Sequence, residues 1–143
     1  MPEVIAHFDP GADVTVQAAV ALTGGRAVGL PASVNAGGFA GIVDSGDGLM
    51  VVGLPLAGGG ILGVASHDAP IGGRVNIMRA PKVVPMECSA AIAISAELMV
   101  GTDGRVATRT AGNTVIGRAW SVTSASGQFC AVELFLNGLL TLT

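Results

Sequence analysis

The chain has 143 residues, of which 22 are glycine, 12% are charged and half are hydrophobic, and its net charge is −3. That length fits one domain with a sizeable core, and a hydrophobic, weakly charged composition is the opposite of the one that keeps a chain disordered. The seven basic residues form no run that could neutralise a phosphate backbone, so we expect no nucleic-acid partner.

The low charge also bears on the surface, because a folded chain with so few charged residues exposes an unusually large apolar area. Soluble monomers seldom leave such an area open, so we expect other subunits or a larger partner to cover part of it. The alternative is a monomer whose surface consists mainly of glycine, alanine, serine and threonine.

The first 13 residues form a predicted extended arm. Pro2, Pro10 and Gly11 prevent a helix there, while the segment between the prolines can add itself to the sheet edge of a partner. The alternative is a first strand inside its own domain. The start of the chain lacks the features of a signal peptide, so we expect synthesis in the cytoplasm. The residues expected to make the arm's contacts are Val4, Ile5, Ala6, His7 and Phe8.

A β-hairpin is predicted after the arm. Runs 14–22 and 26–30 are joined by Thr23-Gly24-Gly25, a connection of hairpin length that contains glycine. The alanine-rich end of the first run, residues 17–22, also fits a helical turn.

A second turn is predicted at Asp44 to Gly48, between strands at 41–43 and 49–54. This turn sequence lacks the later glutamate that a calcium loop requires. The uncharged window 48–66 approaches the length of a membrane span. Its six glycines and one proline argue against a lipid-facing helix, so we expect no membrane partner.

Short apolar runs then follow one another closely, each bounded by glycine, proline or aspartate. Residues 73–78 alternate between polar and apolar, which predicts a strand with Val75 and Ile77 facing inward. Pro85 indicates an edge strand or a bulge, because proline cannot donate to a sheet ladder.

The clearest hairpin covers residues 98–108. Its turn contains Asp103-Gly104, and this dipeptide readily adopts the positive backbone angles of a type I′ turn. The preceding segment, residues 89–98, fits either a short helix or a strand.

The last strand is expected to be half-buried. Cys130, Val132, Leu134 and Leu136 share one face of it, while Phe129, Ala131, Glu133 and Phe135 share the other. Phe129 and Phe135 are therefore predicted to contact a neighbouring subunit.

Few side chains could support chemistry. His7 and His67 lie far apart, and the cysteines do not complete a zinc-binding pattern. Ser66, His67 and Asp68 are adjacent, but neighbours on a strand point to opposite faces and cannot form a nucleophile relay. We therefore expect no catalytic residue, no metal and no cofactor.

The two cysteines and the single tryptophan receive structural interpretations. Without a secretory signal, Cys88 and Cys130 are most simply reduced and buried, although a disulfide remains open if their strands pair. Trp120 is predicted to be an anchor in the core or at a strand end.

Together these elements predict an all-β fold: a small β-barrel or β-tulip-like domain over residues 14–143 with tight glycine-rich turns, preceded by the arm over residues 1–13. The order of the turn-and-strand motifs resembles the bacteriophage capsid cement, or head decoration, proteins. The motifs that carry the resemblance lie at residues 8–15, 23–28, 63–75, 100–106, 112–119 and 129–134.

This resemblance implies a non-enzymatic structural protein of the virion that binds the outer surface of an assembled phage head. It implies the major capsid protein as partner and a homotrimer as the oligomer. A stiff β scaffold with weak charge fits that role, since many weak sites repeated over a symmetric shell give avidity. The alternative is a small cytosolic β-barrel that binds a small molecule, which would need a pocket lined by convergent polar groups.

Overall fold

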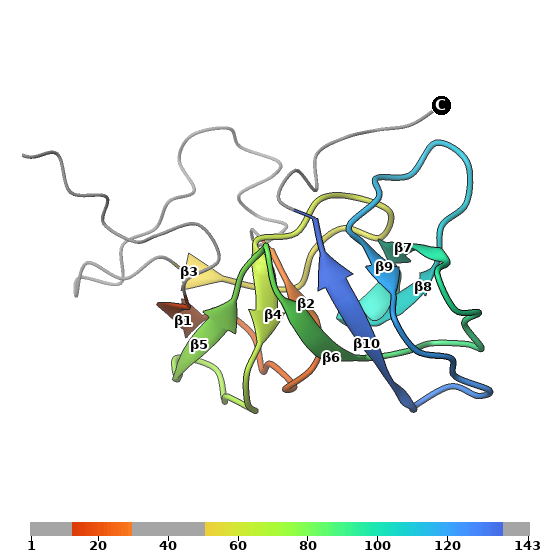
Figure 1. Ribbon diagram of the computed structural model, residues 1–143. Helices are drawn as coiled ribbons and strands as arrows, with labels where there is room; N and C mark the ends of the chain where they lie inside the picture. Colours follow the sequence, from red (N-terminus) through yellow and green to blue (C-terminus); the bar gives the residue numbers. More distant parts are fainter. Residues whose placement is uncertain (1–12, 30–50, 136–143) are drawn as a thin grey trace, which may run out of the picture.

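The computed structural model describes residues 13–29 and 51–135, and Figure 1 shows their arrangement. The residues proposed for the arm, Val4 to Phe8, lie outside the described part. The same holds for the predicted turn at Asp44 to Gly48.

The all-β prediction is confirmed, because ten strands form two five-stranded sheets. The first sheet has the order β2-β4-β5-β1-β3 and the second the order β6-β10-β9-β7-β8. A short 3-10 turn, η2, at Thr102–Gly104 connects β7 and β8. The strands are β1 (Val14–Ala18), β2 (Ala27–Val28), β3 (Val51–Val52), β4 (Gly63–Ala65), β5 (Arg74–Met78), β6 (Val83–Glu87), β7 (Glu97–Val100), β8 (Val106–Thr108), β9 (Gly117–Ala119) and β10 (Phe129–Leu134).

Four strands of the second sheet repeat four strands of the first, while the fifth strand differs in its ladder: β3 pairs with β1 and β8 pairs with β7. β6 pairs with β10 as β1 pairs with β5, and β7 pairs with β9 as β2 pairs with β4. The ladder between β9 and β10 likewise repeats the one between β4 and β5. The described chain therefore consists of two units that share a four-stranded topology: β1 to β5 form the first unit and β6 to β10 the second. They lie side by side in Figure 1.

Hydrogen bonds outside the ladders confirm the equivalence. Leu22 and Ala69 exchange backbone hydrogen bonds of 2.8 and 3.0 Å, and Ile92 and Thr123 exchange bonds of 3.1 and 3.0 Å at the matching place. The backbone angles agree as well, since Gly25, with φ 81°, is matched by Ser95, with φ 63°. A non-glycine residue seldom adopts this left-handed conformation. Because Ser95 adopts it at the position that corresponds to Gly25, the two units share one backbone template.

Each sheet curls until its end strands meet. In the first unit Gly29 and Gly53 form an isolated antiparallel bridge between the ends of β2 and β3. In the second unit Cys88 and Val106 form a parallel bridge between the ends of β6 and β8. Within the described residues each join is one bridge long, so each unit is barrel-like without being closed by a full ladder.

Strand alternation places the core as the sequence predicts. Val75 and Ile77 of β5 are buried between exposed neighbours. In β10 the residues Cys130, Val132 and Leu134 point inward. β-Branched and other compact apolar side chains fit such half-buried strands.

The local predictions have mixed outcomes. The hairpin over residues 98–108 is confirmed, with φ 56° at Asp103 and 82° at Gly104. β6 is an edge strand of its sheet and contains Pro85, as expected. The predicted hairpin between residues 14–22 and 26–30 is wrong, because β1 pairs with β5 and β3, and β2 pairs with β4. Within residues 89–98 there is no helix: residues 89–96 contain a bridge and a turn, and residues 97–98 begin β7.

Each unit has its own hydrophobic cluster, and side chains of the first unit enter the cluster of the second. Ala27 and Val64 belong to the first unit, yet they are buried in the hydrophobic cluster of the second. The backbone NH of Glu87 donates to the Gly25 carbonyl across the joint at 2.8 Å. The Glu87 carboxylate accepts from Arg26 Nε at 2.6 Å and from Arg105 Nε at 3.0 Å, and it is only 15% exposed. Apolar packing and a bridging carboxylate therefore hold the units together.

The joint also requires a glycine at one position. A Cβ on Gly104 would lie 2.6 Å from the backbone oxygen of Ala27, and Gly104 has φ 82°. Gly112 has φ 87°, but a Cβ there would have no atom within 4 Å. Both glycines have a backbone angle that strains other residues, but only Gly104 also lies close to the backbone of the other unit. Comparing the two therefore distinguishes the effect of backbone strain from the effect of close approach.

We expect Gly104→Ala to destabilise the protein more than Gly112→Ala. The strain of a left-handed alanine costs about 1 kcal/mol at both positions, and only Gly104→Ala adds a clash with backbone across the joint. Denaturant unfolding of the two variants and the wild type measures the difference. Equal losses of stability would show that Gly104 plays no part in joining the units.

Candidate interaction surface

The described residues do not assemble a reactive centre. No group of three or more His, Cys, Asp and Glu side chains among them could hold a metal ion. His67 Nδ1 lies 2.9 Å from the backbone oxygen of its neighbour Asp68, while Asp68 Oδ1 accepts from the backbone NH of Gly24 at 2.8 Å. The Asp68 carboxylate thus holds a turn, and Ser66, His67 and Asp68 form no relay. His7 lies outside the described residues.

Both cysteines are free thiols in the core, as expected of reduced, buried side chains. The Cys130 thiol donates to the backbone oxygen of Ser121 at 3.3 Å. Burial raises the pKa of the Cys88 thiol, because desolvation disfavours the thiolate. These thiols are therefore packing groups and weak hydrogen-bond donors.

No helix in the described part of the chain has the length and hydropathy needed to cross a bilayer.

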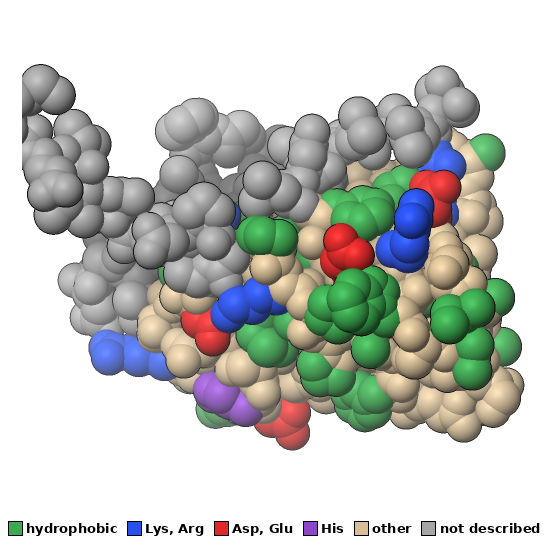
Figure 2. Space-filling view, in the orientation of Figure 1, with side chains coloured by type: hydrophobic (Ala, Val, Ile, Leu, Met, Phe, Trp, Pro, Cys, Tyr) green, Lys and Arg blue, Asp and Glu red, His purple; other side chains and the backbone are tan. Residues whose placement is uncertain are grey.

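The outward side of β6, β10 and β9 carries a group of apolar side chains, which we call the outer face of the second unit. The ladders set Pro85 opposite Ala131, and the backbone NH of Trp120 donates to the Ala131 oxygen at 2.7 Å, so the three lie in one row across the strands. Phe129 lies further along β10 and Val83 further along β6. Figure 2 shows hydrophobic side chains gathered over β10.

The aromatic residues of this face are open to solvent. Trp120 is 57% exposed and Phe129 is 55% exposed. Val122 is also exposed, as is Val83, which lies opposite Glu133. Since a large aromatic side chain has an area of ~150–250 Å², each ring leaves roughly 100 Å² uncovered. Contiguous apolar area of this kind indicates a contact surface.

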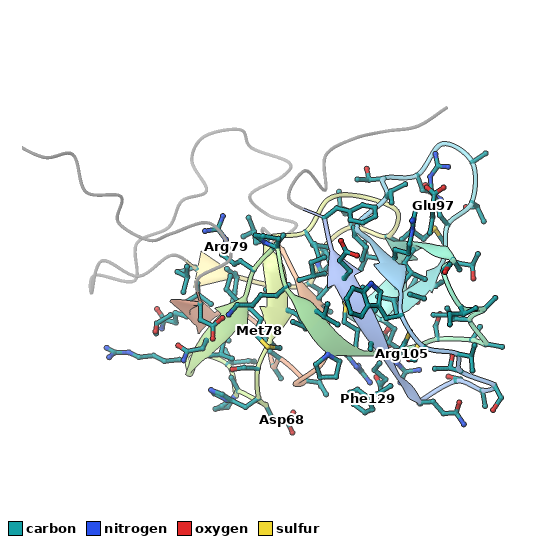
Figure 3. The ribbon with its side chains drawn as sticks, viewed as in Figure 1. Asp68, Met78, Arg79, Glu97, Arg105 and Phe129 are labelled. Atoms are coloured by element: carbon teal, nitrogen blue, oxygen red, sulfur yellow. The ribbon has the colours of Figure 1, made fainter. Side chains whose placement is uncertain are left out.

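Charged residues border the apolar rows. Glu133 on β10 lies opposite Arg118 on β9, and Arg118 lies opposite Glu97 on β7. Trp120 Nε1 donates to Glu133 Oε1 at 3.0 Å, which fixes the indole beside this charged row. Figure 3 shows Glu97 and Phe129 at opposite ends of the second unit, so the charged and the aromatic ends of the face are separate.

The matching face of the first unit is polar. Thr15 and Asn76 are paired in the ladder, and the NH of Ser66 donates to the Asn76 oxygen, so these three occupy the places of Pro85, Ala131 and Trp120. Thr15 Oγ1 also donates to Asn76 Oδ1 at 2.7 Å. The fold therefore accepts polar side chains at these outward positions.

Arg74 stands at the place of Phe129 in the first unit, opposite Gln17 where the second unit has Glu87. The contrast between the two units shows that the apolar residues of the second unit are not required by the strand template itself.

The predicted contact residues have different outcomes. Phe129 points outward and is exposed, and Phe135, just after β10, is half-buried. Their contact with a neighbouring subunit stays a prediction. Trp120 follows the end of β9, as a strand-end residue would, but it is not in the core. The exposure of Trp120 could not be predicted from the sequence, because only the register of the strands shows that Trp120 lies beside Ala131 on the outward side.

Comparison with known proteins gives a family and a fold. A family model described as phage cement protein matches residues 4–134. A solved structure described as the head fiber gp8.5 N base in bacteriophage phi29 is similar, with a TM-score of 0.67, and the match covers 87% of this chain and 94% of that one. The two sequences are 17% identical, so this likeness concerns the fold. No curated protein sequence matches the chain.

We expect Trp120→Ser/Val122→Asp to leave the stability of the isolated chain within about 1 kcal/mol of the wild type, because exposed substitutions seldom cost more. These changes install the residues that the first unit carries at the twin positions, Ser66 and Asp68. Leu98→Ala, which empties a fully buried site, is the comparison and should cost about 2–5 kcal/mol. A large loss in the surface variant, measured by denaturant unfolding, would show that the outer face stabilises the fold itself.

The buried Cys88 thiol predicts a stability loss at alkaline pH. The pKa is 9.0 in the unfolded chain and higher in the folded protein. The contribution of the protonated Cys88 thiol to the stability of the fold is therefore fully present below pH 9.0 and is lost as the pH rises through the folded pKa. Cys88→Ala should lower the free energy of unfolding by about 1 kcal/mol at neutral pH. Above pH 9.0 the stability of this variant should fall less steeply with pH than that of the wild type. Melting curves of both proteins from neutral to alkaline pH test this, and parallel curves would contradict it.

Proposed function

The chain belongs to the phage cement protein family, and on that premise we propose that it binds the outer surface of an assembled phage head and stabilises the capsid lattice. The partner in this proposal is the major capsid protein. The chain is made in the host cytoplasm and acts in the virion as a non-enzymatic structural protein.

The observation that carries this proposal is the outer face of the second unit. Its row of Pro85, Ala131 and Trp120 is apolar where the twin row of the first unit is polar, so the strand template does not require these residues. The Phe129 ring lies against Gly25 of the first unit, where a Cβ would come within 2.5 Å of it, and its other side is open for contact. A cement protein needs contact surface and a stiff scaffold. The packing of Ala27 and Val64 into the second unit and the Glu87 bridge between the units supply the stiffness.

We further propose a division of contacts. The segment Val4 to Phe8 contacts the capsid by adding a strand to an exposed sheet edge, where backbone hydrogen bonds supply affinity and side chains supply specificity. Phe129 and Phe135 contact other copies of the chain. In this proposal the copies assemble as a homotrimer, and repetition over the symmetric shell turns weak single contacts into strong attachment.

The experiment that tests head binding mixes purified protein with heads that lack it. Added density on the outer surface, seen by electron microscopy and saturating with concentration, is the expected result. Heads that gain no density, or density on the inner surface, would contradict the proposal. Resistance of the decorated heads to heat or to loss of DNA then measures the stabilisation.

We expect deletion of residues 2–12 to abolish head binding and to leave the melting temperature within a few degrees of the wild type. The reason is that the described strands begin at Val14, so the deletion removes none of the described strands. Co-sedimentation with heads and a thermal melt give the two readouts. Retained binding would exclude the segment as the clamp, and a collapse of the melting temperature would assign it to the fold.

A further inference from the structure

We propose that the outer face of the second unit binds the same face of a second copy across a two-fold axis that runs along the strands, between β9 and β10. The proposal rests on the subunit contact proposed for Phe129 and assigns that contact to a two-fold axis, which leaves the three-fold contact of the homotrimer to another surface of the chain. It concerns contact between copies of the chain and does not require that the protein bind heads.

The first argument is charge complementarity. Glu133 and Arg118 lie opposite each other on adjacent strands, β10 and β9. A two-fold axis between these strands exchanges the two strand positions, so Glu133 of one copy faces the partner's Arg118, and Arg118 faces the partner's Glu133. Two reciprocal ion pairs follow from one register, whereas an axis along either strand would set like charges against each other.

The second argument is that these charges are available. Arg118 is exposed and makes no ion pair with any described residue, although it lies in register between Glu133 and Glu97. Trp120 Nε1 occupies one oxygen of the Glu133 carboxylate, Oε1. A carboxylate has a second oxygen, which suits the planar guanidinium of a partner.

The third argument is size. The same axis sets Trp120, the largest side chain of the face, against the partner's Ala131, which is small and lies opposite Trp120 in its own sheet. The reciprocal contact is identical, because a two-fold interface uses the same patch twice. A large side chain over a small one allows the two sheets to approach, and sheets that pack face to face keep their strands within about 30° of each other.

The fourth argument comes from the twin face. The first unit carries Ser66 and Asn76 at the places of Trp120 and Ala131, and Met78 and Val64 at the places of Glu133 and Arg118. Val64 is buried against the second unit within the same chain. The first unit therefore has neither the reciprocal charges nor the exposed aromatic residue, and only the second unit can make this contact.

The symmetry has a consequence for the assembly. A two-fold contact yields an even number of chains: two, or six where the proposed three-fold contact forms through another surface. On a head such a contact would join neighbouring trimers to each other, and a lattice of that kind links cement subunits as well as capsid subunits.

The test is a pair of charge reversals, Arg118→Glu and Glu133→Arg, studied without heads. Each variant alone sets like charges against each other in both pairs and should weaken self-association at least tenfold, since close charge pairs at interfaces couple strongly. An equimolar mixture of the two variants restores an opposite charge in both pairs. We therefore expect the mixture to associate nearly as tightly as the wild type, and light scattering at low salt measures the masses.

Trp120 supplies a second readout, because it is the only tryptophan in the chain. Its fluorescence should be open to iodide quenching in each reversed variant and protected in the wild type and in the mixture. A melt of each variant confirms folding, and the recovery in the mixture is itself evidence that both chains are folded.

Three outcomes would overturn the proposal: a wild type that stays monomeric at the highest concentration reached, reversed variants that associate like the wild type, or a mixture that does not recover. If the protein forms trimers and the charge reversals leave the trimer mass unchanged, the variants associate like the wild type and the proposal is overturned. Head binding is measured separately with the variant lacking residues 2–12, so failure of one proposal leaves the other intact.

Discussion

The packing of the two units against each other is the contact on which the rest of this structure depends. The second unit, Val83 to Leu134, is shorter than the ~60 residues at which a single domain is only marginally stable, and the first unit, Val14 to Met78, is close to that length. The structure answers this by burying Ala27 and Val64 of the first unit in the core of the second. Small residues at the joint let backbones approach, as at Gly104 beside Ala27. The rest of the first unit has a hydrophobic cluster of its own, so the joint depends on these few side chains and on the Glu87 carboxylate, which bridges Arg26 and Arg105 with little exposure.

The repeated template separates what folding requires from what function adds. Inward positions keep compact apolar residues in both units, such as Val16 and Met86, or Ile77 and Val132. Outward positions differ: polar Thr15, Asn76 and Ser66 stand where the second unit has Pro85, Ala131 and Trp120, while apolar Met78 and Val64 stand where it has Glu133 and Arg118. Two copies of one template in a single chain thus serve as an internal control that no single sheet provides.

The sequence predicted what depends on short-range rules. Alternation in residues 73–78 and 129–134 gives β5 and β10 with the correct inward residues, since a strand has a period of two. Asp103-Gly104 gives a turn because few dipeptides adopt two positive φ angles easily. The wrong hairpin at residues 14–30 has the opposite cause, since its strands find partners far along the chain, β5 and β4, that no local pattern specifies.

The repetition of one strand template in the two units could not be predicted from the sequence, for a related reason. What the template conserves is backbone geometry, and that geometry accepts different side chains: Ser95 takes the left-handed position that Gly25 holds in the first unit. Residues 30–50 also lie between β2 and β3, where the second unit has a tight turn, so no constant period links the halves.

The sequence predicts one part of the candidate surface, Phe129, and misses another, Trp120. Phe129 was identified because it lies on the polar side of an alternating strand, whereas Trp120 was assigned to an anchor because large aromatic residues are usually well buried. Its exposure follows from the register, which sets it beside Ala131 and Glu133 on the outward side of β10. The composition of a surface that spans three strands depends on which strands pair and in which register. The low charge of the chain predicted that such a surface exists, and only the ladders show where it lies.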